Sequence, residues 1–249
     1  MAAGHAHRRP LTRWLASTPP VEPEQPAQPL YPFHNLVLHV DTSIGAAGVT
    51  LNGNGQVTAW KNQVAGGAHF VPDAPLDYYP DGSTYAVDCR KGTLLATLPQ
   101  TYASPATIFL LLKVLPNTPY SEYQLPIELS NTANADVLRG FVKQSTNVLV
   151  YDGNSYMDLS GQYPINSYCI VSYTTSGDGE YYTGGFNIRS PGISGGGYGG
   201  FYYNRSFNRI ACAVGNYLLK LYLVYNRRLT EQETAEVVAT MQQRFTLFQ

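Results

Sequence analysis

Short hydrophobic stretches separated by turn residues recur along most of the chain from Leu36 onward. Some stretches alternate apolar and polar positions and others are continuously apolar, as strands are when one or both faces of a sheet are buried. Gly, Asn, Asp and Pro bound the stretches at short intervals, which is typical of strands joined by turns. The pattern predicts strands at residues 36–41, 56–60, 106–115, 125–130, 137–143, 147–153, 168–175, 180–188, 200–205, 208–214 and 217–226.

A helical pattern replaces the strand pattern near the C-terminus. Thr230 and Glu233 have the spacing of a capping box, in which the two side chains and backbone amides bond reciprocally at the start of a helix. An apolar stripe at helical spacing follows, formed by Thr234, Val238, Met241 and Phe245. The sequence therefore predicts one helix that covers an edge or an end of the β-structure.

The composition agrees with an all-β protein. Of the 249 residues, 44% are hydrophobic and only 13% are charged, and the chain holds 23 Gly, 17 Pro and 20 Tyr. Such a balance favours many short strands and turns over helices. The length suits one large domain. We therefore expect an antiparallel two-sheet jelly-roll sandwich over residues 36–249.

Residues 1–35 differ from the rest. Residues 1–18 form a basic arm, with candidate anchoring residues Arg8, Arg9, Arg13 and Trp14. Prolines then recur at every third position, at Pro20, Pro23, Pro26, Pro29 and Pro32, which predicts an extended polyproline II rod. The arm and rod are interpreted as an anchor on a spacer; the alternative is a plain solvated linker.

Charge and cysteine usage exclude several partner classes. The net charge of −1 gives no overall attraction to nucleic acid or to an anionic membrane. The longest apolar run, at residues 106–115, is too short for a membrane span and fits a buried strand. No apolar segment follows the N-terminal arginines, so no secretory signal is expected. Cys89, Cys169 and Cys212 lack close-spaced partners and are interpreted as small buried hydrophobic residues.

Candidate catalytic acids are poorly placed. Glycan-cleaving enzymes use paired carboxylates. Glu122 and Glu128 are separated by Pro126, and no acid stands between them. Asp178 and Glu180 flank a glycine in a turn, where solvated carboxylates are ordinary. No metalloprotease, nucleophile-elbow or phosphate-loop motif is present either, so we expect no enzymatic activity and no cofactor.

Two acidic segments have features of ion sites. Asp152, Asn154 and Asp158 alternate like the start of a calcium loop, without the glycine and bidentate glutamate that complete one. Asp73, Asp77 and Asp81 form a second acidic stretch interleaved with prolines. Turn formation accounts for both, and the five histidines lack metal-ligand spacing, so no metal is expected.

Residues 180–205 are unusual because they contain eight glycines and seven aromatic residues. Glycine allows close backbone approach, and tyrosine offers a flat apolar face with a polar tip, which suits sugars and protein partners. Tyr182 and Tyr202 are better explained as cross-strand packing. The candidate ligand-binding residues are Tyr181, Tyr198, Tyr203 and Arg205, with Tyr198 expected in a surface loop.

Four segments carry a recognisable signature: LVLHVDTS, GNGQVTAWKNQ, ATIFLLLKV and YLLKLYLVYNRRLTEQETAEVVATMQQRF. They resemble the laminin-G-like, concanavalin A-like domains of bacteria and their viruses, over about residues 36–246. Asp41 and Trp60 match the opening strands of that family. The closing strand-to-helix passage matches at Tyr225, Asn226, Arg227, Leu229, Thr230 and Glu233. Residues 65–70, AGGAHF, and Asn226 depart from the family pattern, so no ion site is carried over from it.

Three candidate functions are compatible with the sequence. The favoured one is a non-enzymatic bacteriophage virion component, a head decoration or tail-associated protein, homo-oligomeric within the particle. It would be attached to other virion proteins by its arm and would contact host surface glycans. The alternative is a bacterial carbohydrate-binding or adhesion module at the cell surface. The third, a glycan-cleaving enzyme, lacks the paired carboxylates.

Overall fold

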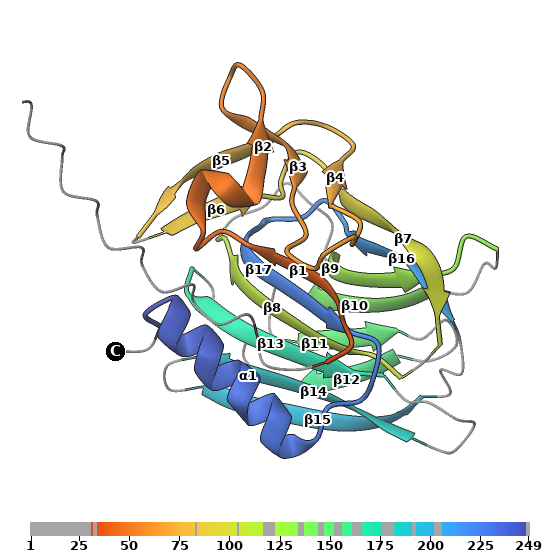
Figure 1. Cartoon of the computed structure of the whole chain (residues 1–249). Helices are drawn as coiled ribbons and strands as arrows, with labels where there is room; N and C mark the ends of the chain where they lie inside the picture. Colours follow the sequence, from red (N-terminus) through yellow and green to blue (C-terminus); the bar gives the residue numbers. More distant parts are fainter. Residues whose placement is uncertain are drawn as a thin grey trace, which may run out of the picture. The chain divides into compact units, whose positions relative to one another are not determined.

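The computed structural model describes residue 31 and residues 34–82, 84–103, 105–116, 123–133, 137–143, 147–151, 156–160, 166–175, 182–190, 193–201 and 206–247. These residues form two antiparallel sheets that pack face to face, with one α-helix against the larger sheet (Figure 1). The all-β sandwich with a helix near the C-terminus, as predicted from the sequence, is confirmed. The predicted arm lies outside the described residues up to residue 30. Among the described residues, no helix is long and apolar enough to cross a membrane.

The larger sheet has ten strands in the order β15-β14-β13-β8-β17-β6-β5-β3-β2, and β1 also pairs with β17. Its members are β1 (Leu36–Asp41), β2 (Val49–Leu51), β3 (Gln56–Trp60), β5 (Leu76–Asp81), β6 (Thr84–Asp88), β8 (Thr107–Val114), β13 (Tyr168–Thr174), β14 (Tyr182–Ser190), β15 (Ile193–Phe201) and β17 (Tyr217–Tyr225). A short 3₁₀ turn, Gly45–Gly48, precedes β2.

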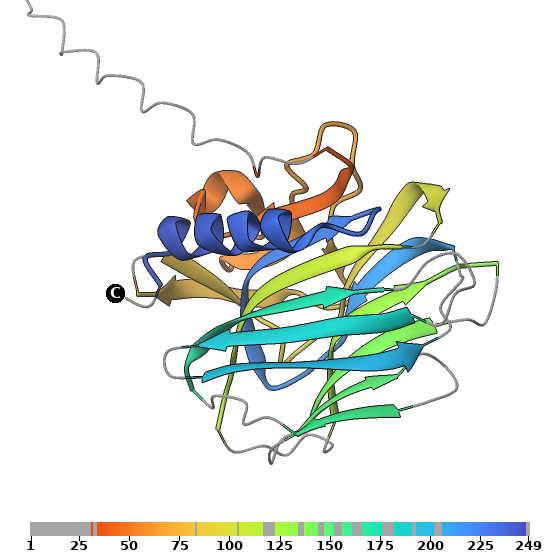
Figure 2. The same ribbon diagram turned by 90° about the horizontal axis from the view of Figure 1, so that it is seen from below.

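The smaller sheet has seven strands in the order β12-β11-β10-β9-β16-β7-β4. Its members are β4 (Val71–Pro72), β7 (Leu94–Tyr102), β9 (Tyr123–Ser130), β10 (Val137–Lys143), β11 (Asn147–Tyr151), β12 (Tyr156–Ser160) and β16 (Phe207–Cys212). The second view shows the strands of the two sheets running in stacked layers (Figure 2).

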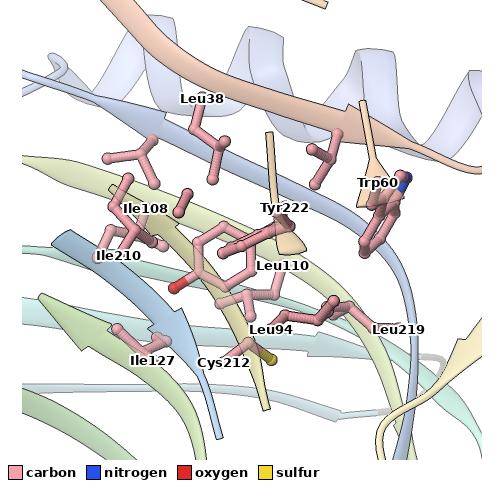
Figure 3. Packing of buried hydrophobic residues seen from close by; sticks show 14 of the residues in the cluster. Leu38, Trp60, Leu94, Ile108, Leu110, Ile127, Ile210, Cys212, Leu219 and Tyr222 are labelled. Atoms are coloured by element: carbon pink, nitrogen blue, oxygen red, sulfur yellow. The ribbon is translucent and has the colours of Figure 1, made fainter. Parts of the chain in front are cut away.

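The main core fills the space between the sheets. Alternate positions of the facing strands supply it, including Leu38, Leu94, Ile108, Leu110, Ile127, Ile210, Leu219 and Tyr222, which lie close together in Figure 3. Trp60 is fully buried at one end of this core, and Phe70 lies between it and Tyr222. Burying each large apolar side chain contributes about 1.5–3 kcal/mol, so this layer is the main source of the sandwich's stability.

A second core lies on the outer face of the larger sheet, under α1 (Glu231–Arg244). It combines residues of the helix with those of β8, β13 and β17: Phe109, Leu111, Ile170, Leu221, Leu223, Tyr225, Leu229, Val237, Val238, Met241 and Phe245. The central strands are therefore buried on both faces, which explains why all nine residues of β17 are buried and why, apart from Lys220, its sequence is apolar.

Tyr31 belongs to this second core although it lies before the predicted domain boundary at Leu36. Its buried ring meets His39 edge-on at 5.1 Å between centroids, and the Arg244 guanidinium lies 5.8 Å from its centroid. The Asn226 amide donates to Asn35 O over 3.0 Å. The chain is thus joined to the sandwich before β1 begins.

The residues that carried the family resemblance have structural roles in this chain. Asp41 is buried and ion-paired, and Trp60 packs in the core. Thr230 and Glu233 form the predicted capping box at the start of α1. The Arg227 guanidinium also binds both oxygens of Glu233, at 2.7 and 3.0 Å. The matching passage therefore fixes the junction of β17 with α1.

Two predictions about local structure need correction. Residues 195–200, expected in a surface loop, lie in β15, which pairs with β14 over its full length. Tyr198 is opposite Gly185 in that register. Residues 76–81, interpreted as part of an acidic turn segment, form β5. Of the predicted strand at residues 200–205, residues 200 and 201 belong to β15, and residues 202–205 lie outside the described residues.

Candidate functional site

A depression of about 410 Å³ lies at the β4 edge of the smaller sheet. Its lining is mostly apolar, with three polar side chains, and consists of Ala68, His69, Val71, Pro72, Asp73, Leu95 and Thr97. Val71 is 54% exposed, more than any other large hydrophobic residue described. An apolar surface with a few fixed polar groups is the usual character of a small-molecule site.

The strand pairing of β4 with β7 creates this surface. Val71 pairs with Leu95 and Pro72 pairs with Leu94. Because side chains alternate along β7, Leu94 enters the core while Leu95 and Thr97 face away from it. Proline lacks an amide donor, so Pro72 suits an edge position and closes the sheet against a further strand. The depression therefore lies where the sheet ends.

The segment before β4 is held firmly to the rest of the domain. Trp60 and Phe70 exchange two backbone hydrogen bonds of 2.8 and 3.0 Å, with both rings in the core. The buried Asn62 side chain accepts from the amides of His39 and Val64, and donates to the carbonyl of Val37. The position of His69 is thus fixed by packing and hydrogen bonds on both sides of it.

His69 and Asp73 are exposed and oriented. The Asn62 amide donates to Nδ1 of His69 over 3.0 Å, so the neutral ring carries its proton on Nε2. The Thr93 amide donates to Oδ1 of Asp73 over 2.8 Å. Each contact fixes one polar atom. Within the described part of the chain, no contact engages Nε2 of His69 or Oδ2 of Asp73. The depression thus offers a hydrogen-bond donor and a charged acceptor beside an apolar floor.

A second polar cluster lies across β5, β8, β13 and β17. Asp81 contacts Lys113 Nζ at 3.1 Å and Lys220 Nζ at 3.6 Å, and the Tyr168 hydroxyl donates to it. Burial, followed by the hydrogen bond to Asp81, raises the pKa of Tyr168 strongly. Burial lowers the pKa of Lys220. The Asp81 carboxylate is thus neutralised by the two lysines, and the cluster links β5, β8, β13 and β17.

The acidic stretch considered as an ion site is used by the fold. Asp77 contacts Lys91 Nζ at 2.6 Å, and hydrogen bonds from Lys91 and Gln56 lower its pKa. Asp81 is bound by two lysines, and Asp73 caps the Thr93 amide. In the described part of the chain, no three His, Cys, Asp or Glu residues gather as a metal site.

Most site residues predicted from the sequence belong to parts of the chain that the structure does not describe. Outside the described residues lie Tyr181, Tyr203, Arg205, Arg8, Arg9, Arg13, Trp14, Glu122, Asp178, Glu180, Asp152 and Asn154. Tyr198 lies in β15 and Asp158 in β12, and neither strand is near β4 in the sheet order. Glu128 lies in β9, opposite Arg139. The predicted binding role of Tyr198 therefore stays a prediction.

Sequence reasoning missed the depression because its two halves are separated by about 25 residues of chain. The sequence predicts a turn at Asp73 and gives no sign of its place beside β7. A signal existed in residues 65–70, AGGAHF, where the sequence departs from the family pattern. This departure contains His69 and leads directly into β4. The three cysteines, by contrast, are buried as predicted.

No known protein family matches the chain, and no curated protein matches its sequence. Solved structures do match its fold. The binding domain of botulinum neurotoxin DC in complex with SialylT has a TM-score of 0.54 at 10% identity, over 83% of this chain and 52% of that one. The receptor-binding domain of the botulinum neurotoxin mosaic serotype C/D gives 0.57 at 9% identity, over 84% and 51%.

Trypanosoma rangeli sialidase in complex with sialic acid has a TM-score of 0.58 at 14% identity, over 88% of this chain and 35% of that one. The chain thus spans about half the length of the neurotoxin domains and about a third of the sialidase. These likenesses show the sandwich fold. The bacteriophage origin suggested by the sequence resemblance stays a prediction.

Proposed function

We propose that the chain is a carbohydrate-binding β-sandwich and that the depression between β4 and β7 is its sugar-binding surface. The observation that carries the proposal is the combination of an exposed apolar floor with the oriented side chains of His69 and Asp73. This proposal follows the alternative function considered from the sequence and places the site away from the aromatic stretch.

The chemistry of the depression suits a saccharide. The apolar C–H face of a sugar ring would pack on Val71 and Leu95, which releases water from a side chain that is otherwise exposed. A sugar hydroxyl would donate to Asp73, and His69 Nε2–H would donate to another oxygen. Hydrogen bonds to a charged acceptor such as Asp73 contribute about 1.5–3 kcal/mol. The edge itself is closed to strand addition, because β4 has two residues and one is Pro72.

The structural comparisons support the same class of ligand. One neighbour is a binding domain in complex with SialylT, and another is a sialidase in complex with sialic acid. Both contain the sandwich fold found in this chain over more than four fifths of its length. A two-sheet sandwich of this kind therefore occurs in proteins that hold sugars.

We further propose that binding is not followed by cleavage. Glycoside hydrolysis ordinarily uses two carboxyl groups about 5–9.5 Å apart on either side of the bond. Asp73 is the single carboxylate among the lining residues of the depression. The site would thus hold a glycan without supplying both an acid and a base.

A virion component would use the same surface to contact host glycans. In that setting the attachment arm predicted from the sequence at residues 1–35 would act through its part that precedes Tyr31, residues 1–30. Co-purification of the chain with virus particles, and its loss on deletion of residues 1–30, would support this finer assignment. If the chain does not co-purify with particles, the virion role is contradicted and only the carbohydrate-binding proposal stands.

The sugar-binding proposal is tested by titrating the full chain with sialylated, galactosylated and glucan oligosaccharides. We expect binding to at least one class, and Asp73→Asn and His69→Ala each to weaken it by about tenfold or more. Asp77→Asn is the matched control, because Asp77 is a surface carboxylate of β5 outside the depression. Binding that both lining variants leave unchanged would overturn the placement. Release of reducing sugar would overturn the non-enzymatic part.

A further inference from the structure

Two of the three cysteines meet where the chain crosses between the sheets. Cys89 directly follows β6 of the larger sheet, and Cys212 ends β16 of the smaller sheet. Both are fully buried in the core between the sheets, and Cys212 is opposite Leu94 in the pairing of β16 with β7 (Figure 3). The two thiols therefore lie at the ends of two separate crossings.

Backbone hydrogen bonds hold these crossings against each other. The Cys89 amide donates to Tyr217 O over 3.1 Å, and the Gly215 amide donates to Cys89 O over 3.0 Å. The Val214 amide donates to Thr93 Oγ1 over 3.2 Å. Cys89 is thus bonded on both sides to the short turn that follows Cys212.

The side chains complete the contact. The Cys212 sulfur lies 3.1 Å from the Tyr217 hydroxyl, which in turn donates to Ala213 O. Burial and, after it, the neighbouring Cys212 thiol raise the pKa of the Cys89 thiol. Cys169 lies elsewhere, in β13, where its thiol donates to Leu112 O over 3.5 Å. The fold therefore selects one pair out of three possible pairs.

We propose that Cys89 and Cys212 are a disulfide-forming pair that covalently joins the two sheets when the chain folds in the presence of a small-molecule disulfide oxidant. One cysteine thiolate attacks the oxidant's disulfide and releases its first thiol, giving a mixed disulfide. The second cysteine thiolate then attacks the protein sulfur and releases the second thiol. Two protons leave the cysteines, and two electrons reduce the oxidant.

The disulfide would form during folding, before the native core closes, and not in the folded protein. The thiolate is the reacting form, and burial raises the pKa of the Cys89 thiol well above its ordinary value. The closed core also excludes the oxidant from both sulfurs. Cysteine pairing therefore takes place before the sheets close over it, and the closed core then protects the bond from reductants.

The bond would constrain a large part of the smaller sheet. Residues 89–212 include β7, β9, β10, β11, β12 and β16. Closing so long a loop restricts the unfolded chain strongly. We therefore expect the oxidised domain to unfold at a higher denaturant concentration than the same protein after reduction.

The test uses the full chain, unfolded with reductant and refolded in a mixture of reduced and oxidised glutathione. Thiols are then counted in denaturant, and peptides are mapped without reduction. The proposal expects the count to fall from three to one, with a peptide containing Cys89 joined to one containing Cys212. Three remaining thiols, or a disulfide that includes Cys169, would overturn it.

Single variants sharpen the result. Cys169→Ala should still lose two thiols and leave none, whereas Cys212→Ala should retain both of its remaining thiols. Loss of thiols in Cys212→Ala would show pairing of Cys89 with Cys169 and so contradict the proposal. Since the decisive measurement is made on the unmodified chain, a folding defect in a variant would not obscure the answer.

Discussion

Arg244 at the end of α1 lies 2.6 Å from Asp41 at the end of β1, measured from Nε to Oδ2. The Asp41 side chain is fully buried and that of Arg244 is 8% exposed. The Arg244 Nε–H donates to Ser43 Oγ over 2.7 Å, so the contact with Asp41 is chiefly ionic. Helix and sheet are thereby joined by a buried charge pair.

Removing one charge of this pair should destabilise the domain strongly. Arg244→Met leaves Asp41 buried without its partner, and such a change costs about 3–5 kcal/mol. Urea unfolding measures the loss. The control is Lys91→Met, whose ion pair with Asp77 is exposed and should contribute at most about 1 kcal/mol. Equal effects of the two variants would contradict the assigned burial.

Glu233 should make stability depend on acid pH. Hydrogen bonds from Arg227 and from the Thr230 amide lower its pKa in the folded chain from 4.5 to about 2. A depressed folded pKa stabilises above the unfolded value, and the benefit is lost as the pH falls from about 4.5 toward 2. The urea midpoints of wild type and Glu233→Gln should therefore differ at pH 7 and converge over that window.

Glu236→Gln is the control for this measurement, since Glu236 is exposed on the same helix. Its difference from wild type should stay small at every pH. A gap between wild type and Glu233→Gln that persists unchanged at pH 2 would show that the Arg227 contact does not act through charge.

Two buried tyrosines should respond oppositely to loss of the hydroxyl. The Tyr222 hydroxyl has no hydrogen-bond partner among the described residues, while its ring packs on Phe70. Tyr222→Phe should therefore stabilise the domain by about 1 kcal/mol. Tyr217→Phe loses bonds to Ala213 O and Cys212 and should destabilise it. Thermal melting distinguishes the two signs, and a loss of stability in Tyr222→Phe would reveal a partner.

Deletions at the N-terminus should separate the arm from the core. Removing residues 1–30 retains Tyr31, whereas removing residues 1–35 takes its buried ring from beside His39 and Arg244. Loss of a buried aromatic side chain costs about 3 kcal/mol or more. We expect the longer deletion to unfold at clearly lower urea concentration, and identical midpoints would contradict the packing of Tyr31.

The elements that the sequence predicted are those with a complete hydrophobic pattern. β8 and β17 are apolar at almost every position because α1 covers their second face. The capping residues Thr230 and Glu233 marked the helix start. In these elements, local pattern and tertiary packing require the same residues, so the sequence alone sufficed.

The missed elements depend on pairing with distant strands. β15 is rich in glycine and carries no apolar alternation, yet β14 pairs with it at nine positions. β5 contains Asp77 and Asp81, whose charges are met by lysines of other segments. β4 has two residues and no pattern of its own. The depression could not be predicted from the sequence for the same reason, because it is formed only where β4 pairs with β7.

The placement of α1 also affects how the chain is made. A ribosome produces β8, β13 and β17 before the helix that shields their outer face. Until α1 emerges, Phe109, Leu223 and their neighbours present an apolar stripe to water, next to strands whose inner face is already committed to the core. A nascent or prematurely terminated chain would therefore carry an adhesive surface suited to self-association. By covering this stripe, α1 removes a surface through which chains could self-associate.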